Sequence, residues 1–237
     1  MTQGALPRHV AVIMDGNGRW AMRHKLQVAM GHRKGVEALR AVIRLSSDLG
    51  VEALSLYAFS TENWRRDPKE VGALMGLLLE YFTKEIDELH EKNVCIRILG
   101  DVDGLPEAQR NAVRAAEART RGNTGLKLNI ALNYGGRAEL ARAARLLAAR
   151  AARGEIRPED IDESMLADAL YTHGLPDVDL LIRTSGEMRL SNFLLYQCAY
   201  AEFEFPAVLW PDFDEKAYRE ALEAFAARDR RFGGRKG

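Results

Sequence analysis

Few features of this sequence point to an extracellular or membrane-embedded protein. The 237 residues include only two cysteines, Cys95 and Cys198, which lie far apart and form no CxxC pair. Neither a disulfide framework nor a cysteine-bound zinc site is expected, and a cytoplasmic protein is the simplest interpretation. Residues 1–9 contain no apolar signal core, and no apolar run approaches the roughly 18 residues of a membrane-spanning helix. Any contact with a membrane is therefore expected to be peripheral.

Net charge is also absent, because 34 Lys and Arg residues balance 34 Asp and Glu residues. A protein that binds nucleic acid usually carries a clear basic excess, so this balance disfavours a nucleic-acid partner. The sequence also lacks the GxSxG and HExxH motifs of two common hydrolase classes. A local excess of positive charge lies at residues 228–237, which contain five basic residues and one acidic residue.

The chain length fits a single α/β domain over residues 1–237, in which short apolar runs alternate with amphipathic stretches. Strands are predicted at residues 10–14, 53–59, 95–99, 127–132 and 180–182, with a sixth candidate at 201–205. Helices are predicted at residues 35–49, 68–92, 106–120, 136–153, 164–171 and 215–228. This alternation predicts a mostly parallel six-stranded sheet with helices on both faces.

The helix predicted at residues 68–92 has the clearest pattern. Its apolar residues recur at spacings of three and four: Val71, Leu74, Met75, Leu78, Leu79, Phe82, Ile86 and Leu89. Asp67 is a suitable N-cap, and Pro68 suits the first helical position. We therefore expect a long helix with one continuous apolar face.

Polar and glycine-rich segments follow the predicted strands. They are residues 15–19, 60–64, 100–101, 133–137 and 183–187. Ligands of parallel sheets bind beyond the carboxyl ends of the strands, where these segments would gather. Because several of them carry arginine, the layout predicts a site for phosphate groups.

The segment Asp15-Gly-Asn-Gly-Arg19 gives the strongest of these signals. Its two glycines allow the backbone to approach an anion closely, and a following helix would present N–H groups to that anion. Arg19 adds a forked cation, and Asp15 is a hard oxygen ligand suited to Mg²⁺ that bridges phosphate oxygens. A glycine-rich turn capped by Asp15 is the structural alternative. The segment is not a P-loop, because no Gly-Lys-Ser/Thr follows.

Two further segments carry candidate ligands. Residues 183–192 include two arginines and two serines, and guanidinium groups suit bidentate contacts with diphosphate. A loop with solvated arginines is the alternative. Glu202 lies in an apolar sequence, where a free carboxylate would be costly. Metal ligation would offset that cost, and so would an ion pair with a buried arginine.

Eight blocks in order resemble the cis-prenyltransferases, whose common bacterial member is undecaprenyl diphosphate synthase. They are Asp15-Gly-Asn-Gly-Arg-Trp20, Gly31-His32, Tyr57-Ala-Phe-Ser-Thr-Glu-Asn-Trp64, Asn133-Tyr-Gly-Gly-Arg137, Arg183-Thr-Ser-Gly-Glu187, Arg189-Leu-Ser-Asn-Phe193, Trp210-Pro-Asp-Phe213 and Arg231-Phe-Gly-Gly234. They span essentially the whole chain. The DDxxD motif of the all-helical trans-prenyltransferases is absent.

The resemblance implies two substrate sites. For the allylic diphosphate (farnesyl diphosphate or a shorter primer) it implies Gly16, Asn17, Gly18, Arg19, Trp20 and His32, together with a segment that closes over the substrates and includes Ser60, Thr61, Glu62, Trp64, Arg66 and Glu70. For isopentenyl diphosphate it implies Arg183, Arg189 and Ser191, with Arg231 and Gly233 reaching across a homodimer interface. It assigns catalytic roles to Asp15 and Asn63, and it assigns a Mg²⁺ ion to Asp15 and Glu202.

By the same resemblance, an apolar tunnel between the 68–92 helix and the sheet holds the growing product. Ala58 would lie near its mouth, while Val94 and Leu126 would approach its floor; ordinary core positions are the alternative for all three. The implied reaction adds isopentenyl units to make a polyprenyl diphosphate such as undecaprenyl diphosphate, the lipid-carrier precursor for cell-wall synthesis. A short- or medium-chain synthase, a non-catalytic partner subunit and a phosphate-binding regulatory module are the other hypotheses.

Two positions depart from the pattern that the resemblance implies. Family members usually carry Arg three residues before Gly31, where this chain has Val28. Either the allylic substrate binds more weakly or a neighbour such as Lys25 or Arg33 takes over the contact. Some members also have His at the position of Met188.

Overall fold

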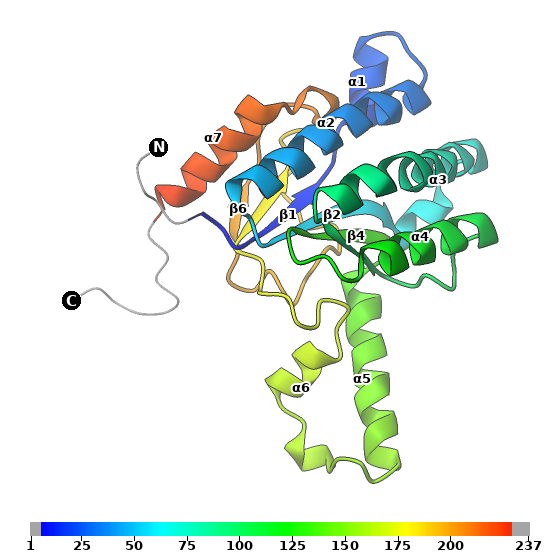
Figure 1. Ribbon diagram of the computed structural model, residues 1–237, viewed down its shortest axis with the longest axis vertical. Helices are drawn as coiled ribbons and strands as arrows, with labels where there is room; N and C mark the ends of the chain where they lie inside the picture. Colours follow the sequence, from blue (N-terminus) through cyan, green and yellow to red (C-terminus); the bar gives the residue numbers. More distant parts are fainter. Residues whose placement is uncertain (1–5, 229–237) are drawn as a thin grey trace.

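The computed structural model describes residues 6–228 and contains one six-stranded sheet, in which every pairing is parallel (Figure 1). The strands are β1 (His9–Ile13), β2 (Ala53–Ser60), β3 (Cys95–Leu99), β4 (Lys127–Tyr134), β5 (Leu180–Arg183) and β6 (Glu202–Glu204). Their order across the sheet is β3-β4-β2-β1-β5-β6. The predicted α/β fold with six strands is confirmed.

Among residues 6–228, seven α-helices and three 3₁₀ helices accompany the strands. They are α1 (Asn17–Arg23), α2 (Val28–Leu49), α3 (Pro68–Glu91), α4 (Glu107–Thr120), α5 (Gly136–Ala152), α6 (Glu163–Asp168) and α7 (Glu215–Ala226), with η1 (Thr61–Arg65), η2 (Pro158–Asp160) and η3 (Trp210–Asp212). None of the helices among residues 6–228 is long and apolar enough to cross a membrane.

The main difference from the predicted elements lies at the start of the chain. A short helix α1 precedes α2, and α2 begins at Val28 rather than at residue 35. Glycine usually lowers the expectation of a helix, but here Gly31 lets α2 approach α1. A Cβ atom at Gly31 would lie 2.1 Å from the carbonyl oxygen of Asn17. Close helix packing therefore outweighs the low helix propensity of glycine.

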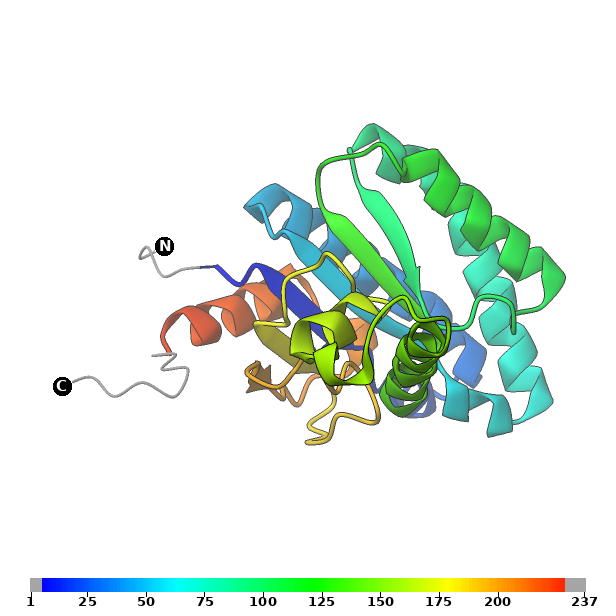
Figure 2. The ribbon, with the colours of Figure 1, turned by 90° about the horizontal axis from the view of Figure 1, so that it is seen from below.

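The two faces of the sheet are covered differently. Alternation along β1 sends Val10 and Val12 toward a large core that includes residues of α2, α3, α4 and α7. Ala11 and Ile13 point to a smaller core, which is closed largely by irregular chain around Phe193. Helices therefore dominate one face, and the prediction of helices on both faces is only partly met. Helices α5 and α6 extend away from the sheet as an arm, as Figure 1 shows, and Figure 2 looks along this arm from below.

The strand order brings two loops together. β1 lies between β2 and β5, and Ile13 at its carboxyl end is in register with both Tyr57 and Arg183. After β4 the chain crosses to the other side of β1, where β5 and β6 lie. β1 and β5 are therefore neighbours, but the chain leaves them in opposite directions along the sheet, toward β2 and toward β6. Such a position is where parallel sheets usually bind ligands.

Candidate active site

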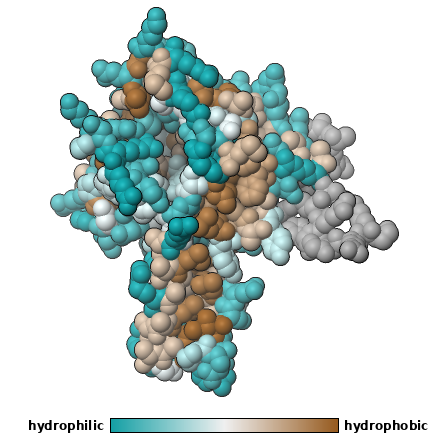
Figure 3. All heavy atoms as spheres, turned by 180° about the vertical axis from the view of Figure 1, so that it is seen from behind, coloured by the Kyte–Doolittle hydropathy of each residue, from teal (hydrophilic) through white to brown (hydrophobic). Residues whose placement is uncertain are grey.

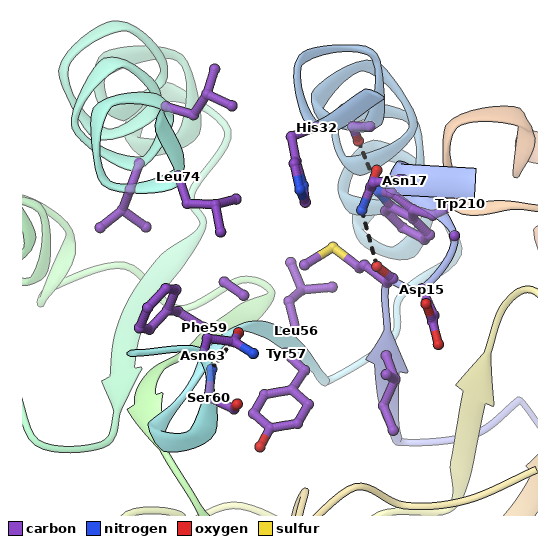
Figure 4. A pocket seen from close by; sticks show the side chains of 18 of the residues that line it. Asp15, Asn17, His32, Leu56, Tyr57, Phe59, Ser60, Asn63, Leu74 and Trp210 are labelled. Atoms are coloured by element: carbon purple, nitrogen blue, oxygen red, sulfur yellow. Dashed lines mark hydrogen bonds between the residues drawn. The ribbon is translucent and has the colours of Figure 1, made fainter. Parts of the chain in front are cut away.

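A cavity of about 990 Å³ opens at this carboxyl edge of the sheet. Side chains of α2 and α3 face one another across it, above β1 and β2 (Figure 4). One part of its wall is polar and comes from residues that follow β1, β2 and β5. The rest is apolar and comes mainly from α2, α3 and β2. The predicted meeting of polar segments at this edge is confirmed for the loops after these three strands.

Asp15 lies two residues beyond β1 and is held by two arginines. Its Oδ2 accepts a hydrogen bond of 2.9 Å from Nη2 of Arg183, and its Oδ1 lies 3.4 Å from Nη2 of Arg19. Burial raises the pKa of Asp15, but the hydrogen bond from Arg183 and the charges of both arginines outweigh it, so the pKa is lowered. Asp15 therefore presents an ionised carboxylate in the polar part of the cavity.

Arg183 is the more deeply placed of these arginines, with a side chain that is 4% exposed. Besides Asp15, its guanidinium donates hydrogen bonds to the carbonyl oxygen of Arg189 at 2.5 Å and to Oγ of Ser191 at 2.7 Å. It thus joins the loop after β1 to the loop after β5. Its Nε atom is buried and has no hydrogen-bond partner in the described part of the chain.

Arg19 and Arg189 share the carboxylate of Glu187 beside the cavity mouth. Glu187 lies 3.1 Å from Nη1 of Arg19 and forms an ion pair with Arg189. Arg19 also donates a hydrogen bond of 2.6 Å to Oγ of Ser185. The arrangement is one in which an anionic ligand could replace the Glu187 carboxylate between two guanidinium groups.

The turn between β1 and α1 depends on glycine. Gly16 has φ +110°, and a Cβ atom there would lie 3.0 Å from Cδ2 of Leu209. Asn17 follows and donates a hydrogen bond of 3.2 Å to the carbonyl oxygen of Met14. Gly16, Asn17, Gly18 and Arg19 all line the cavity, and their binding of a diphosphate stays a prediction.

His32 of α2 faces α3 across the cavity mouth. Its Nε2 lies 3.7 Å from Oε1 of Glu70, which also accepts a hydrogen bond of 2.9 Å from Arg66. Burial lowers the pKa of His32 despite the nearby Glu70 carboxylate. His32, Arg66 and Glu70 therefore link α2 to α3, with the imidazole mainly neutral at pH 7.

The segment after β2 is fixed by hydrogen bonds at several points. Ser60 and Asn63 form a reciprocal capping box, in which the amide of Ser60 donates to Oδ1 of Asn63 at 3.1 Å (Figure 4). Glu62 accepts a hydrogen bond of 2.9 Å from Asn192 in the loop after β5. Ser60, Glu62 and Asn63 line the cavity, whereas Thr61 and Trp64 do not.

Trp64 has a structural position instead. Its Nε1 donates a hydrogen bond of 2.8 Å to Oδ1 of Asn133, and its ring packs edge-on against Phe59. Trp20, which was expected at the allylic site, also points elsewhere. Its Nε1 donates to Asp212 at 2.8 Å, and its ring stacks on His24. Both tryptophans hold cavity-forming elements in place without lining the cavity.

The apolar part of the cavity extends between α3 and the sheet, as predicted. It is lined by Val36, Leu39, Leu56, Ala58, Phe59, Leu74, Met75, Leu77, Leu78, Tyr81, Phe82 and Ile130. Ala58 is the extra residue of a bulge in β2, since Tyr57 pairs with Ala131 and Phe59 with Leu132. The bulge changes the direction of the strand where it enters the cavity wall.

The floor of the cavity differs from the prediction. Val94 and Leu126 are buried core residues that do not line it. Tyr81 lines it, and Tyr81 also lines a second, small cavity of about 30 Å³ that Val94 borders on the far side. Both Val94 and Leu126 precede their strands and so lie at the opposite edge of the sheet from the polar mouth.

Glu202 is likewise far from the position that its predicted role requires. In the parallel register it aligns with Leu180, which aligns with Val10, five residues before Asp15. Its carboxylate instead forms an ion pair of 3.0 Å with Arg228, which also pairs with Glu204. This register does not bring Glu202 and Asp15 of one chain together at a shared metal ion. The other interpretation, an ion pair with a buried arginine, is met only in part, because Arg228 is exposed.

The remaining predicted residues have varied positions. Arg189 and Ser191 line the cavity, and so does Val28 at its exposed edge. Met188 is 77% exposed and does not line it. Arg231 and Gly233 lie outside the described residues.

Two important wall residues were not predicted as site residues. Tyr57 stacks on Phe193 and donates a hydrogen bond of 3.2 Å to the carbonyl oxygen of Ser191. Trp210 is buried and donates a hydrogen bond of 2.9 Å to the carbonyl oxygen of Gly35. Each belongs to a block that the sequence analysis noted, but only the tertiary contacts place them at the cavity.

Comparison with known proteins agrees with this geometry. Residues 13–233 match the family model described as "Putative undecaprenyl diphosphate synthase". The chain belongs to this family. It is therefore a prenyltransferase, and the recognition made from the eight sequence blocks is confirmed.

Individual relatives cover nearly the whole chain. The isoprenyl transferase of Geobacillus kaustophilus is 52% identical over 229 residues, which is 97% of this chain and 89% of that protein. The ditrans,polycis-undecaprenyl-diphosphate synthase of Escherichia coli K12, described as specific for (2E,6E)-farnesyl diphosphate, is 51% identical over 96% of this chain and 90% of that protein.

Solved structures share the fold. Lavandulyl diphosphate synthase from Lavandula x intermedia, in complex with dimethylallyl diphosphate, is 38% identical with a TM-score of 0.94, over 96% of this chain and 98% of that chain. A probable undecaprenyl diphosphate synthase from Campylobacter jejuni is 32% identical with a TM-score of 0.79, over 97% of this chain and 99% of that chain.

Proposed function

We propose that this prenyltransferase condenses isopentenyl diphosphate onto an allylic diphosphate, with Mg²⁺ as cofactor, to make a long-chain polyprenyl diphosphate such as undecaprenyl diphosphate. The observation that carries the proposal is the division of one cavity into two chemical parts. Asp15 and Arg19 lie in its polar mouth, and an apolar space continues behind them toward Tyr81. A prenyl diphosphate is divided in the same way, into a charged diphosphate group and an apolar hydrocarbon chain.

The residues around Asp15 fit a magnesium site that the substrate completes. Mg²⁺ prefers oxygen ligands and is commonly held by one or two carboxylates together with phosphate oxygens. Asp15 supplies an ionised carboxylate beside the arginines that would hold the diphosphate. When bound there, Mg²⁺ would supply positive charge that neutralises the diphosphate leaving group.

The chain's own residues would act mainly by electrostatic stabilisation. As the allylic C–O bond breaks, negative charge grows on the departing diphosphate. Arg19 and the backbone N–H groups after Gly16 would stabilise that charge, while Arg183 keeps Asp15 oriented. The double bond of isopentenyl diphosphate then forms a bond to C1 of the allylic group, and a proton is lost.

Arg189 and Ser191 are proposed to bind the isopentenyl diphosphate. Both line the polar mouth, on the side of the cavity built by the loop after β5. Arg183 would contribute less directly than the sequence analysis expected, because its Nη atoms already bind Asp15, Arg189 and Ser191. The two substrates would thus be held by loops from neighbouring strands.

The apolar part of the cavity would hold the growing chain. Burial contributes about 0.8 kcal/mol per CH₂ group, or roughly 4 kcal/mol for each five-carbon unit. This stabilisation favours successive additions over early release. A short- or medium-chain product is the second candidate, because the large side chains of Tyr81 and Phe82 line the apolar part of the cavity.

We also propose a homodimer, with the α5–α6 arm in its interface. The arm extends from the body of the molecule and carries the exposed side chains of Leu146 and Ile161. Figure 3 shows apolar atoms in a continuous stripe along it. Exposed apolar stripes of this kind commonly mark protein interfaces. Analytical ultracentrifugation of the full chain and of Leu146→Glu tests this arrangement.

Product analysis tests the proposed reaction. Purified protein is incubated with Mg²⁺, labelled isopentenyl diphosphate and dimethylallyl, geranyl or farnesyl diphosphate in turn. We expect a cis product that disappears when EDTA removes the metal. Absence of incorporation with every primer would contradict the proposal and favour a non-catalytic subunit.

A further inference from the structure

An exposed apolar segment joins α1 to α2. Among the described residues, ten large hydrophobic side chains are exposed, and four of them fall within residues 22–30: Met22, Leu26, Val28 and Met30. Met22 is the most exposed of these, at 66%. We call residues 22–30 the α1–α2 tip. Single exposed apolar residues are common on proteins, but such a concentration marks a binding surface.

The tip is also basic. Residues 22–30 contain Arg23 and Lys25 and no Asp or Glu, although the whole chain has no net charge. Within the part of the chain that the structure describes, Arg23 and Lys25 form no ion pair. Arg33 remains 62% exposed although Nη2 lies 3.5 Å from Glu80. The tip therefore combines apolar side chains with unneutralised positive charge.

The tip lies at one end of the molecule and close to the cavity. Figure 1 shows α1 and the connection to α2 at the outer end of the molecule, beyond the sheet. In Figure 3, apolar atoms lie among hydrophilic ones at that upper end. Val28 belongs both to the tip and to the wall of the cavity. Whatever binds the tip would therefore lie next to the cavity mouth.

We propose that the α1–α2 tip binds the surface of a bilayer that contains anionic phospholipid. Met22 and Leu26 would enter the boundary between headgroups and acyl chains, and Arg23 and Lys25 would bind the phosphates. This combination of apolar and basic side chains is typical of surfaces that lie on a membrane without crossing it. The positive charge of the tip favours an anionic membrane over a neutral protein surface, because a neutral surface would leave the basic side chains unpaired.

Membrane binding by the tip is separate from the proposed reaction, but it would affect how the product leaves. An apolar product would leave the cavity beside Val28, directly toward the bilayer. Vesicle binding itself needs no substrate. A chain that binds vesicles but makes no polyprenyl product would refute the proposed function alone, and the reverse result would refute the proposed membrane surface alone.

The experiment measures cosedimentation of the full-length protein with vesicles of phosphatidylcholine, alone or mixed with phosphatidylglycerol. We expect binding to the mixed vesicles, weakened by salt. Arg23→Gln/Lys25→Gln should weaken partitioning about 30-fold, roughly fivefold for each charge removed near an anionic surface. Met22→Ser/Leu26→Ser should weaken it about tenfold or more, because it removes the inserted apolar area.

Matched controls change similar side chains elsewhere. Arg121→Gln/Lys216→Gln removes the same charge from exposed positions after α4 and in α7, and Leu6→Ser removes an exposed apolar side chain. These variants should bind like the unmodified protein. Equal binding by the tip variants and the controls would overturn the proposal. Self-association without vesicles, abolished by both tip variants, would also overturn the proposal. A second copy of the chain would then occupy the surface.

Discussion

At the scale of single residues, the most consequential contact is the one between Asp15 and Arg183. The arginine is almost fully buried, so removal of the carboxylate would leave a buried charge without a partner. A substitution that keeps a hydrogen-bond acceptor separates the effect on catalysis from the effect on folding. Asn meets that requirement, whereas Ala does not.

Asp15→Asn is therefore expected to fold and to lose activity. Loss of the negative charge removes the proposed metal ligand, and we expect turnover to fall by about a hundredfold or more. Turnover is measured at saturating substrate, and thermal unfolding of the same sample is the control. Activity near that of the unmodified enzyme would remove Asp15 from the mechanism.

Val28 offers a second test at this scale. It lies at the exposed edge of the cavity, at the position where the resemblance noted in the sequence implies Arg. A charge-assisted hydrogen bond contributes about 1.5–3 kcal/mol, so Val28→Arg should lower the Michaelis constant for the allylic substrate about tenfold or more. The measurement is made without lipid. An unchanged constant would show that a neighbour such as Lys25 or Arg33 already makes the contact.

At the scale of helices, a glycine in α2 and a glycine in α3 are expected to affect stability in opposite directions. A Cβ atom at Gly76 in α3 would meet no atom within 4 Å, whereas one at Gly31 in α2 would overlap Asn17. Gly76→Ala should raise the free energy of unfolding by about 0.5–1 kcal/mol, because alanine favours helix. Gly31→Ala should lower it. Chemical denaturation of the two variants provides the comparison, and equal shifts would contradict this account of α2.

Tyr81 of helix α3 separates two cavities and is expected to limit the length of the larger one. The side chain borders both the large cavity and the small one beyond it. Tyr81→Ala should connect the two spaces and shift the products toward longer chains. Val94→Ala enlarges only the far space and should leave product length unchanged. Chromatography of the products measures both, and equal distributions for Tyr81→Ala and the parent enzyme would refute this role.

At the scale of the whole molecule, a buried polar group in the sheet couples stability to pH. His9 is fully buried, and its Nδ1 lies 2.7 Å from the carbonyl oxygen of Pro176. Its Nε2 lies 2.7 Å from Oγ of Ser55, and that oxygen accepts a hydrogen bond of 3.2 Å from Asn129. These contacts suit a neutral imidazole that donates from Nδ1 and accepts at Nε2.

Burial lowers the pKa of His9 from its ordinary value of 6.5. The unfolded chain therefore binds a proton below pH 6.5 that the folded chain does not, and stability falls as the pH decreases through that range. The slope from this group is at most about 1.4 kcal/mol per pH unit. The difference in unfolding free energy between the unmodified protein and His9→Gln should shrink from pH 7.5 to pH 5.5. A constant difference would exclude His9 as the source.

The sequence by itself determined the fold class and the side of the sheet that carries the site. Alternating apolar runs specify strands and helices. Polar residues that follow the strands specify the edge at which the cavity opens, because parallel strands place those segments together. Asp15, Arg19, Arg189 and Ser191 could be identified in this way. The eight blocks then identified the family.

Contacts that depend on register and on packing between distant segments could be found only in the three-dimensional structure. The register places Glu202 toward the amino end of the sheet, beside Arg228 and away from Asp15. The packing of α3 makes Tyr81 part of the cavity wall and leaves Val94 behind it. Local sequence cannot encode these outcomes, since each one depends on how far a strand is shifted or which side a helix turns inward. Those choices are made by the packing of the whole core.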